Sequence, residues 1–445
     1  MYFESLPQVN VYEGSHIEYI NPISGTEGTE PGSPLKFVIT GTENFVDLAK
    51  TYLILRCKLK GSFTYKEGEN VITKTAKVTD ILNTKLTPVN ILPHALFKHI
   101  RIKLGNQNIT GGDTDYAYKA YLQLLFNTNK DAQENYFKLC GWEKDEADMH
   151  DNIAVSSADA TTLAHGAAVK RRKLMSDDGE CEYIMKIHSA LFFHDKAIPP
   201  YLDIEIEMLR HPNSSFYLMY ANGANFSVEI TKAFLQVQKL HVVPEYVAGI
   251  EEMLRKNNEN IIFPLNDSYV GNYVINSGVY NYHNDTLFLG RIPKRIIIGF
   301  VESSAYNGSS IKNPFNFQKS DIEYVRLTKN GLDYPHPPLI IDWDKDHYKQ
   351  AYNYLCSSVQ GDYNDAVLQI TPTEFKEGFT FFSYDMSPDQ RGSVDLHNAA
   401  NKPSQIKFEI RFKTPPAHPL QMIVYFETDT IISFDYKRNV MVTHL

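Results

Sequence analysis

Segments in which apolar and polar residues alternate recur along the whole chain. In residues 53–60 (LILRCKLK) every second position is apolar, and most of the intervening positions are charged. Residues 100–104 (IRIKL) repeat this pattern. Because successive side chains of a strand point to opposite faces, the alternation predicts antiparallel sheets with one buried and one solvated face.

The same succession of patterns occurs twice. After residues 100–104 come a Gly105-Asn106 turn and the tyrosine-rich segment 116–126 (YAYKAYLQLLF); after residues 324–327 (YVRL) come Asn330-Gly331 and residues 347–355 (HYKQAYNYL). The strand offset is 325 − 102 = 223, and the offset of the tyrosine segments is 352 − 121 = 231. A second pair of strands, 204–208 and 408–412, is 204 residues apart. Repeats at half the chain length predict two similar domains, since solenoid repeats are only about 20–50 residues long.

Three segments have helical signals. In residues 116–126 the apolar positions Tyr118, Tyr121, Leu122 and Leu125 fall on one helical face, with Asp113 or Asp115 as the expected cap. Residues 245–256, entered through Pro244, and residues 345–355 are the other expected helices. Short strands dominate the rest and predict an all-β protein built of sandwiches or barrels; they are expected at 183–187, 190–193, 201–209, 226–243, 270–275, 295–301, 379–383, 406–413, 422–426 and 430–434.

Turn-rich stretches divide the chain into an expected arm and two domains. Residues 1–34 form the arm, because residues 24–33 hold turn formers without apolar periodicity. The first domain is expected over 35–222 and the second over 223–445. Within the first domain, residues 140–182 form a long excursion between strands.

Composition and charge narrow the functional classes. The 28 Tyr and 25 Phe favour strands, and the net charge of −9 argues against a surface that wraps nucleic acid, although one basic patch remains compatible with it. Cys57, Cys140, Cys181 and Cys356 form no CxxC pair, and Cys57 lies on the apolar face of its strand. We therefore expect a reducing intracellular compartment. The N-terminus resembles no signal peptide and no apolar run is long enough to cross a bilayer, so we expect a soluble protein without a transmembrane segment.

The chain shows no catalytic, cofactor-binding or metal-binding motif. It contains no G-x-S-x-G, P-loop or G-x-G-x-x-G sequence, no zincin histidine pair and no H-x-H. The best metal candidate, Asp342-Trp-Asp344-Lys-Asp346, has His347 and Asn353 where a calcium loop needs Gly and Glu. The favoured interpretation is that these carboxylates cap the helix that follows, with a cation site as the alternative.

Three further groups have a functional and a structural interpretation. Lys170–Lys173 (KRRK) is an import signal or polyanion contact, or, as we favour, a solvated loop. The row Asp203, Glu205 and Glu207 is a set of acid–base carboxylates or, more simply, the wet face of a sheet. Tyr280 and Tyr282 form a stacking platform or, as we favour, fill loops over the end of a sandwich.

Five stretches in a fixed order resemble a known family. They are Asn44–Leu48 with Thr51–Leu53, Val89–Phe97, Tyr116–Tyr121, Leu287–Ile296, and Tyr306–Gly308 with Asn313–Phe317. This ordered set is similar to the hexon-type major capsid proteins of Polinton/Maverick elements and adintovirus-like double-stranded DNA viruses. The likeness covers about residues 35 to 440; the arm and the excursion match poorly.

The resemblance implies a non-enzymatic structural protein. Its fold would be two tandem eight-stranded jelly rolls, and three chains would form a pseudo-hexagonal homotrimer that tiles an icosahedral capsid. Partners would be neighbouring capsomers, penton and minor capsid proteins and, indirectly, the encapsidated DNA, in a virion whose protein is made in the host cytoplasm, with the host nucleus as a candidate place of assembly. The two tyrosine-bearing helices would occupy equivalent places, and the excursion 140–182 would be an outward tower or a trimer contact.

Three other classes of protein remain open. A carbohydrate- or cell-surface-binding β-sandwich predicts an exposed aromatic site and a monomer or small oligomer. A jelly-roll enzyme whose metal is held by the fold predicts bound metal after purification. A host-domesticated capsid-like protein would keep the fold but no longer build virions.

Overall fold

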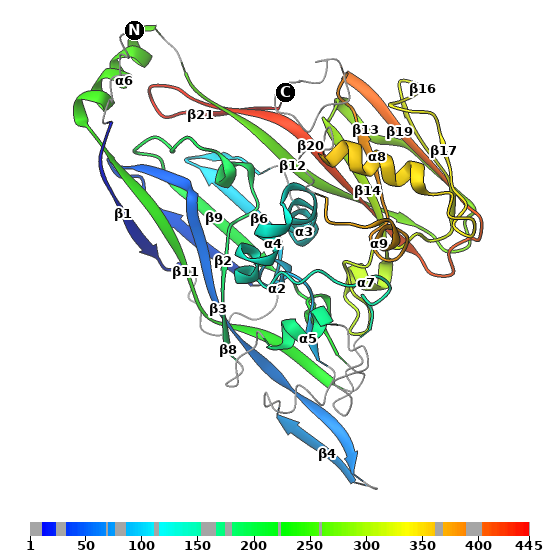
Figure 1. Cartoon of the computed structure of the whole chain (residues 1–445). Coiled ribbons are helices and arrows are strands. Elements are labelled where there is room, and N and C mark those ends of the chain that lie inside the picture. Colours follow the sequence, from blue (N-terminus) through cyan, green and yellow to red (C-terminus); the bar gives the residue numbers. More distant parts are fainter. Residues whose placement is uncertain are drawn as a thin grey trace, which may run out of the picture.

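The computed structural model describes residues 11–23, 33–67, 70–75, 86–110, 115–152, 166–173, 180–220, 224–257, 260–360, 368–388 and 403–444 (Figure 1). Its strands group into two pairs of large sheets, one pair in each half of the chain, and a small sheet in which β5 (Thr87–Pro88) pairs with β10 (Leu218–Met219).

The first half contains two antiparallel sheets. In sheet A, the order is β1 (Tyr12–Ile20), β11 (Ala224–Val242) and β3 (Phe45–Glu67), and β3 also pairs with β8 (Glu180–Met185) and β4 (Asn70–Thr75). In sheet B, the order is β2 (Pro34–Ile39), β9 (Ile204–Arg210), β6 (Phe97–Leu104) and β7 (Gln107–Asn108). The expected alternation is confirmed, since Leu53, Leu55 and Cys57 of β3 are at most 1% exposed.

The second half contains the matching pair. In sheet D, the order is β12 (Ile261–Ile275), β20 (Leu420–Phe434), β14 (Arg295–Glu302) and β18 (Phe381–Asp385), with β21 (Val440–His444) paired to β20. In sheet E, the order is β13 (Asn281–Arg291), β19 (Pro403–Phe412), β15 (Ile322–Lys329) and β16 (Leu332–Asp333), with β17 (Leu339–Ile340) paired to β15.

The two halves have the same strand order, which confirms the predicted duplication. β1-β11-β3-β8 corresponds to β12-β20-β14-β18, and β2-β9-β6 corresponds to β13-β19-β15. The repeated segments 100–104 and 324–327 lie in the equivalent strands β6 and β15, and 204–208 and 408–412 lie in β9 and β19. The fold class expected from the resemblance, two tandem jelly rolls with short helices in the loops, is therefore present.

Helices occupy the connections between strands. The expected helices at 116–126 and 245–256 are present as α3 and α6. The helix α3 comes after β6, and α8 comes after the equivalent strand β15. Among the described residues the helices are α2 (Leu92–Ala95), α3 (Tyr116–Asn127), α4 (Lys130–Glu134), α5 (Gly166–Lys173), α6 (Pro244–Asn257), α7 (Ser303–Asn307), α8 (Lys349–Gln360) and α9 (Pro372–Lys376), with 3-10 turns η1 (Tyr136–Cys140), η2 (Ala190–Phe193) and η3 (Ser214–Phe216).

Four predictions differ in the structure. Residues 422–426 and 430–434, expected as separate strands, lie in the single strand β20. Residues 190–193 form the 3-10 turn η2 instead of a strand, because Phe192 N donates to Ser189 O within the segment. The helix expected at 345–355 begins at Lys349 and continues to Gln360. Asp115 precedes α3, but its side chain caps no backbone amide of the helix; Asp113 lies outside the described residues.

Strand pairing bears on where the two units meet. β1 lies inside the expected arm, 1–34, and pairs with β11 along its length. β11 lies beyond the expected boundary at residue 222, yet it pairs with β1 and β3. The division of the chain into 1–34, 35–222 and 223–445 stays a prediction, and this pairing favours a boundary after β11.

The β14–β18 part of sheet D is buried on both faces, whereas β12 at its edge keeps exposed positions. Every residue of β18 and all but the last residue of β14 are buried, whereas β9 alternates between buried and half-buried positions. Figure 1 shows α3 between this sheet and the first half, and α8 lies against β18 of the same sheet. At Gly299 of β14, an added Cβ would lie 2.5 Å from the Phe317 ring, so the absence of a side chain lets the ring pack directly on the sheet.

A three-stranded extension of sheet D reaches over the first half. The ends of β12 and β20 pair beyond the body of the sheet and are joined there by β21 (Figure 1). Lys196 Nζ donates to Ile262 O at 3.0 Å, and Arg438 Nε donates to Pro200 O at 3.1 Å. The two halves are therefore joined at this end as well as along the helices between them.

Candidate functional site

The seam between the two halves is built around α3. Ten of its twelve residues are buried, so the helix has no solvated face. The Tyr121 ring stacks on Phe315 with centroids 4.3 Å apart, and Phe126 meets Phe381 edge to face at 5.0 Å. Both partners belong to the second half of the chain. An aromatic helix from one half therefore completes the core of the other.

Polar side chains on α3 fix its position against β12. The buried Lys119 ammonium pairs with the Asp267 carboxylate at 3.6 Å, and Gln123 Nε2 donates to Ser268 Oγ at 2.7 Å. At the start of the helix, Tyr306 Oη and Asn272 Nδ2 both donate to the Asp115 carboxylate. Because these contacts are directional and buried, they specify how the two halves are oriented.

A buried ion pair ties four elements at the other end of the seam. Arg295 of β14 donates through Nε and Nη2 to the two carboxylate oxygens of Glu427 on β20, at 3.0 and 2.5 Å. Its Nη2 also donates to Asn127 Oδ1 of α3, and its Nη1 to Ser358 O of α8. This guanidinium joins both repeated helices to sheet D.

The excursion 140–182 contributes to the same seam where it is described. Lys144 Nζ donates to Glu374 Oε1 at 2.7 Å, and Asn313 N donates to Asp151 Oδ1 at 2.7 Å. These contacts join the excursion to the second half of its own chain. The tower or trimer-contact hypothesis therefore concerns mainly residues 153–165 and 174–179, which lie outside the described residues.

The basic run Lys170–Lys173 is only partly a surface feature. Arg171 is 2% exposed; it pairs with Asp145 at 2.7 Å and donates to Glu143 O and Pro88 O. Lys170 is exposed, and the side chains of the last two residues of the run are outside the description. Arg171 therefore fits neither interpretation, a solvated loop or a polyanion contact, because its guanidinium is buried and bonded to these internal groups.

The candidate cation loop does not converge on a metal site. Asp342 pairs with Lys345, Asp344 with Lys413 and Asp346 with Lys376, at 3.1, 2.6 and 2.7 Å. The hydrogen bond from Lys376 lowers the pKa of Asp346. Asp342 Oδ1 accepts the amides of Asp344 and Lys345 and so caps the turn before α8 instead of α8 itself. Across the described ranges, no three His, Cys, Asp or Glu residues are grouped to hold a metal ion.

The acidic row Asp203, Glu205 and Glu207 is a solvated sheet face, as favoured. Glu205 pairs with Lys36 and Lys103 on the neighbouring strands, and Glu207 pairs with Arg101. Charged pairs across three strands of sheet B explain the alternation without acid–base chemistry.

Tyr280 and Tyr282 have different environments. The Tyr280 side chain is 58% exposed, whereas Tyr282 packs against the core and, as a strand residue, pairs with Ile410. The two rings therefore do not form the paired stacking platform that was the functional alternative.

The cysteines come closer together than their sequence positions suggest. Cys57 of β3 and Cys181 of β8 are cross-strand partners, and both are free thiols. Burial raises the pKa of Cys181 to about 11 and that of Cys140 to about 12, so both stay protonated near neutral pH. They act as small core residues, as expected for Cys57.

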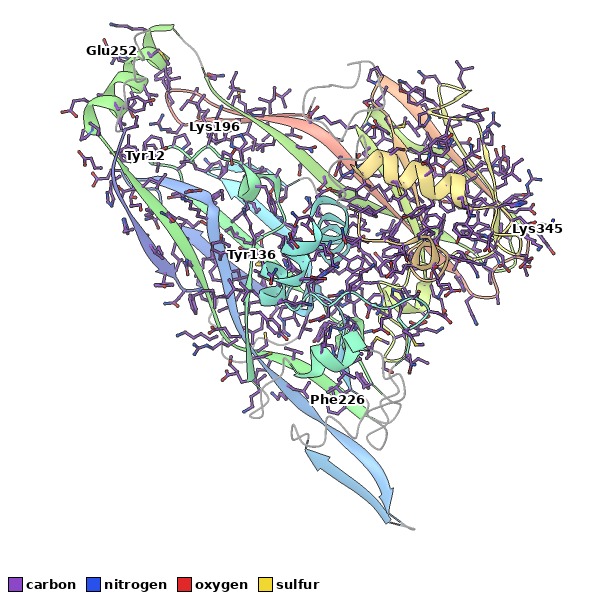
Figure 2. All side chains as sticks on the ribbon, in the orientation of Figure 1. Tyr12, Tyr136, Lys196, Phe226, Glu252 and Lys345 are labelled. Carbon is purple, nitrogen blue, oxygen red and sulfur yellow. The ribbon has the colours of Figure 1, made fainter. Side chains whose placement is uncertain are left out.

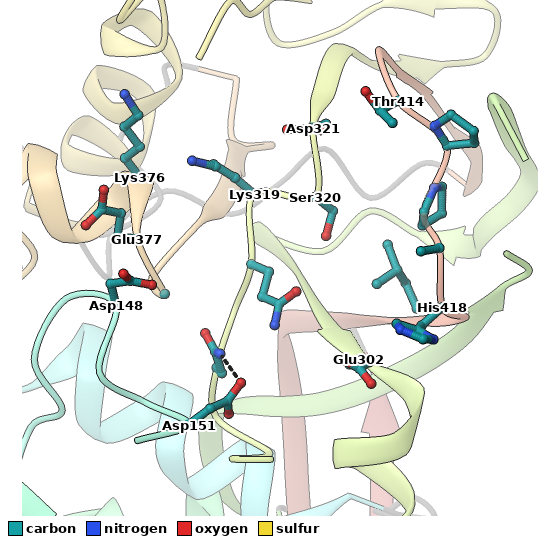
Figure 3. Close-up of a pocket in the computed structure, with 17 residues that line it drawn as sticks. Asp148, Asp151, Glu302, Lys319, Ser320, Asp321, Lys376, Glu377, Thr414 and His418 are labelled. Atoms are coloured by element: carbon teal, nitrogen blue, oxygen red, sulfur yellow. Dashed lines mark hydrogen bonds between the residues drawn. The ribbon is translucent and has the colours of Figure 1, made fainter. Parts of the chain in front are cut away.

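A cleft of about 540 Å³ lies between the loop 148–151, Glu302 and the turn 414–418 (Figure 3). Asp151 accepts a hydrogen bond from Asn316 Nδ2 at 3.0 Å, drawn as a dashed line in Figure 3. Asp151 and Glu302 both pair with Lys312, at 3.5 and 3.4 Å. These carboxylates connect loops at the end of the second half, and their arrangement is that of a structural network.

The outer face of sheet A carries an apolar belt, defined here as Tyr19, Phe234, Ile54 and Ile184. These residues cross the sheet from β1 to β8: Tyr19 meets Phe234 at 5.5 Å, Phe234 pairs with Ile54, and Ile54 pairs with Ile184. Tyr19 is 61% exposed, and Tyr136, which contacts the neighbouring Tyr52, is 44% exposed. An adjoining charged row includes the Arg56–Glu182 ion pair. An apolar strip across a whole sheet face is typical of a protein contact surface.

The charged residues of the seam are hard to recognise in the sequence because they lie inside apolar patterns. Lys119 interrupts the tyrosine-rich segment, and Arg295 precedes the apolar run 296–298. A charged residue at an otherwise buried position is the available signal, since such groups are rarely buried without a partner.

Comparisons with known proteins agree with this architecture. No protein-family model matches the chain. An uncharacterized protein of Caenorhabditis elegans is 23% identical over 421 residues, which cover 92% of this chain and 93% of that protein. In the structure of the Sputnik virophage, a matching chain has a TM-score of 0.65 at 9% identity, over 99% of this chain and 90% of that chain.

Two major capsid proteins are similar as well. That of mavirus has a TM-score of 0.57 at 10% identity, covering 99% of this chain and 92% of that chain. That of Faustovirus has a TM-score of 0.55 at 9% identity, covering 96% and 92%. The fold is a double jelly roll of the viral capsid type. At these identities the comparison concerns the fold, and function needs separate support.

In the part of the chain that the structure describes, no helix has the length and apolarity required to cross a membrane.

Proposed function

We propose that this double jelly roll is a major capsid protein whose trimers form pseudo-hexagonal capsomers of an icosahedral shell. The observation that carries the proposal is the pair of halves whose main strands have the same order, joined by the buried seam. Three such chains present six similar units around one axis, so one protein can meet neighbours in a nearly sixfold manner. Repeating head-to-tail contacts of this kind close into rings when the rotation permits it.

Self-association needs a surface, and the apolar belt of sheet A is the best one described. We assign it to a second copy of the chain, because one structure of similar fold is that of a virus capsid, the capsid of PBCV-1. The role is structural and non-enzymatic. Its further partners would be penton and minor capsid proteins and, indirectly, double-stranded DNA, with the virion as its location after synthesis in the host cytoplasm and assembly there or in the nucleus.

The protein would come from a Polinton/Maverick element or an adintovirus-like double-stranded DNA virus. The first jelly roll would run from β1 to β11 and the second from β12 to β21, with α6 as the connection.

Expression of the chain alone tests the proposal. We expect a mass near three times 50.9 kDa by sedimentation or light scattering, and capsomers or closed shells by negative-stain electron microscopy. A strict monomer at high concentration would contradict it. A loop deletion limited to residues 153–165 tests the trimer contact without removing Lys144 or Arg171: intact trimers and normal particles would show that this loop is no trimer contact.

A second candidate is a host-domesticated capsid-like protein. The relative from Caenorhabditis elegans favours it, because a protein of similar length occurs in an animal. It predicts trimers of the same mass that form no closed shells under any assembly condition, and particle imaging distinguishes the two.

A further inference from the structure

The helix α6, which connects the two halves, has an apolar stripe that is only half covered. Tyr246, Val247, Ile250, Met253 and Leu254 fall at spacings that place them on one side of the helix. Leu254 is 2% exposed, whereas Tyr246 is 47% and Met253 is 49% exposed. One edge of the stripe therefore packs on the protein, and the Tyr246–Met253 edge is open.

The start of β1 and the end of β11 both lie next to this helix. Figure 1 shows α6 at a corner of the molecule, at the ends of β1 and β11, and Figure 2 labels Glu252 on the helix with Tyr12 just below it. Tyr12 pairs with Val242, and Val243 N donates to Val11 O at 3.0 Å. Residue 11 thus lies beside the residue that precedes α6, and the ten residues before it are attached there.

Those ten residues have the composition and length to cover the open edge. Residues 1–10 read MYFESLPQVN, and five of them are apolar: Met1, Tyr2, Phe3, Leu6 and Val9. An extended segment of this length spans up to about 33 Å. The fourteen residues of α6 are about 21 Å long, so the segment can reach from one end of the helix to the other.

We propose that residues 1–10 dock along the Tyr246–Met253 edge of α6 in the same chain. We assign the segment to the helix of its own chain, because a short linker gives an effective concentration on the order of millimolar, far above that of a second copy in solution. A bilayer is a poorer occupant, since interfacial helices are rich in Lys and Arg on their polar face. In α6 the acidic Glu245, Glu251 and Glu252 outnumber Arg255 and Lys256.

The consequence is a clasp between the beginning of the chain and the connection between its halves. It would shield the open edge of α6 and hold β1, an edge strand of sheet A, at its first residues. This inference goes beyond the capsid role and is tested on whatever oligomer the chain forms.

Hydrogen exchange measured by mass spectrometry gives the first test, on the whole chain and on a chain that starts at residue 11. We expect amides of α6 to exchange at least about tenfold faster in the shortened chain, with β15 unchanged as an internal reference. Met253→Ser in the full chain should have the same effect as the truncation. The adjacent Glu252→Ser, which introduces the same residue on the polar side, should have less than about a third of it. Equal exchange in the full and shortened chains would overturn the proposal.

Cross-linking identifies the occupant. Phe3→Cys and Met253→Cys are combined in a chain with Cys356→Ser, since the other three native cysteines are buried. After mild oxidation, a 3–253 disulfide mapped in a monomer-sized band supports docking within one chain. The same disulfide in a dimer-sized band assigns the segment to a neighbouring copy and overturns the proposal, as does the absence of any 3–253 link.

Discussion

At the scale of single residues, the tyrosines of α3 share one buried helix but not one environment. The Tyr116 hydroxyl lies 3.0 Å from His94 Nδ1 and accepts the His188 amide at 3.2 Å. The Tyr121 hydroxyl is buried and has no hydrogen-bond partner among the described residues. A buried hydroxyl without a partner costs free energy, whereas a bonded one stabilises.

The two positions therefore predict opposite responses to loss of the hydroxyl. Tyr121→Phe keeps the stack on Phe315 and should raise the free energy of unfolding by about 0.5–1 kcal/mol. Tyr116→Phe should lower it by about 1–2 kcal/mol, since two buried groups lose their partner. Urea unfolding followed by fluorescence measures both, and a loss of stability in Tyr121→Phe would show that its hydroxyl is bonded after all.

Two buried histidines predict acid sensitivity. Burial lowers the pKa of His94 to about 3 and lowers that of His188 well below its usual value. The rings are 4.9 Å apart, and His188 Nδ1 lies 2.7 Å from Gln123 Oε1 on α3. Because the folded-state pKa is depressed, the unfolded chain binds more protons below about pH 6.5. Stability is therefore fully present above that pH and falls as the pH drops towards 3.

Melting temperatures at pH 7.5 and 5.5 test this effect. Wild type should lose more stability over this interval than His94→Gln, which cannot take up the proton. The exposed His283, replaced by Gln, serves as the control and should behave as wild type. An identical pH dependence in all three proteins would exclude His94 as the titrating group.

At the scale of elements, α3 differs from an amphipathic surface helix, which keeps one face in solvent. Its sequence predicts one apolar face, but the structure buries it on all sides because the second half covers what the first leaves open. Neither half is complete alone. Its equivalent α8 lies on sheet D of its own half and contacts β18, so the repeated helices have equivalent places in the chain but unequal surroundings.

Separate expression of the halves follows from this. Residues 11–243 alone would expose Tyr118, Tyr121 and Phe126, each of which buries about 150–250 Å² in a core. We expect that fragment to aggregate and to become soluble when it is co-expressed with residues 244–445. Solubility of both fractions, compared by gel and size-exclusion chromatography, is the measurement. A well-folded monomeric first half would contradict the role given to the seam.

At the scale of the whole molecule, the outer sheet faces differ. The outer face of sheet E carries ion pairs such as Lys407–Asp285 and Arg326–Asp333, while sheet A carries the apolar belt. Exposed ion pairs stabilise little and remain hydrated, but an apolar strip with an exposed aromatic residue such as Tyr19 favours contact with protein. The asymmetry agrees with a molecule that associates mainly through its first half.

Substitution in the belt tests that assignment. Phe234→Ser, on the outer side of β11, should weaken self-association by about tenfold or more, because a buried aromatic contact is lost at an interface. Lys58→Ser, an exposed change on the same sheet face, should leave it within about twofold. Sedimentation velocity over a range of concentrations measures the change. Equal association of the two variants would place the contact on another surface.

Local patterns gave correct predictions where neighbouring residues decide the outcome. The strand containing residues 53–60 and the row at 203–207 follow from period-two alternation. Predictions were wrong where the structure depends on distant residues. Residues 190–193 have a strand-like composition but form a 3-10 turn. Arg171 lies in a basic run but is buried in an ion pair with Asp145. The contacts of the seam could not be predicted from local patterns, because partners such as Lys119 and Asp267 are far apart in the chain.

Two similar β-rich halves can be predicted from the order of residues alone, because strand alternation is a local property that each segment carries with it. Which charges are internal, and how the halves are joined, depend on contacts between distant parts of the folded chain. Arg295 and Glu427, or Cys57 and Cys181, become neighbours through strand pairing over more than a hundred residues. Burial depends on such neighbours, and the order of residues alone does not reveal them.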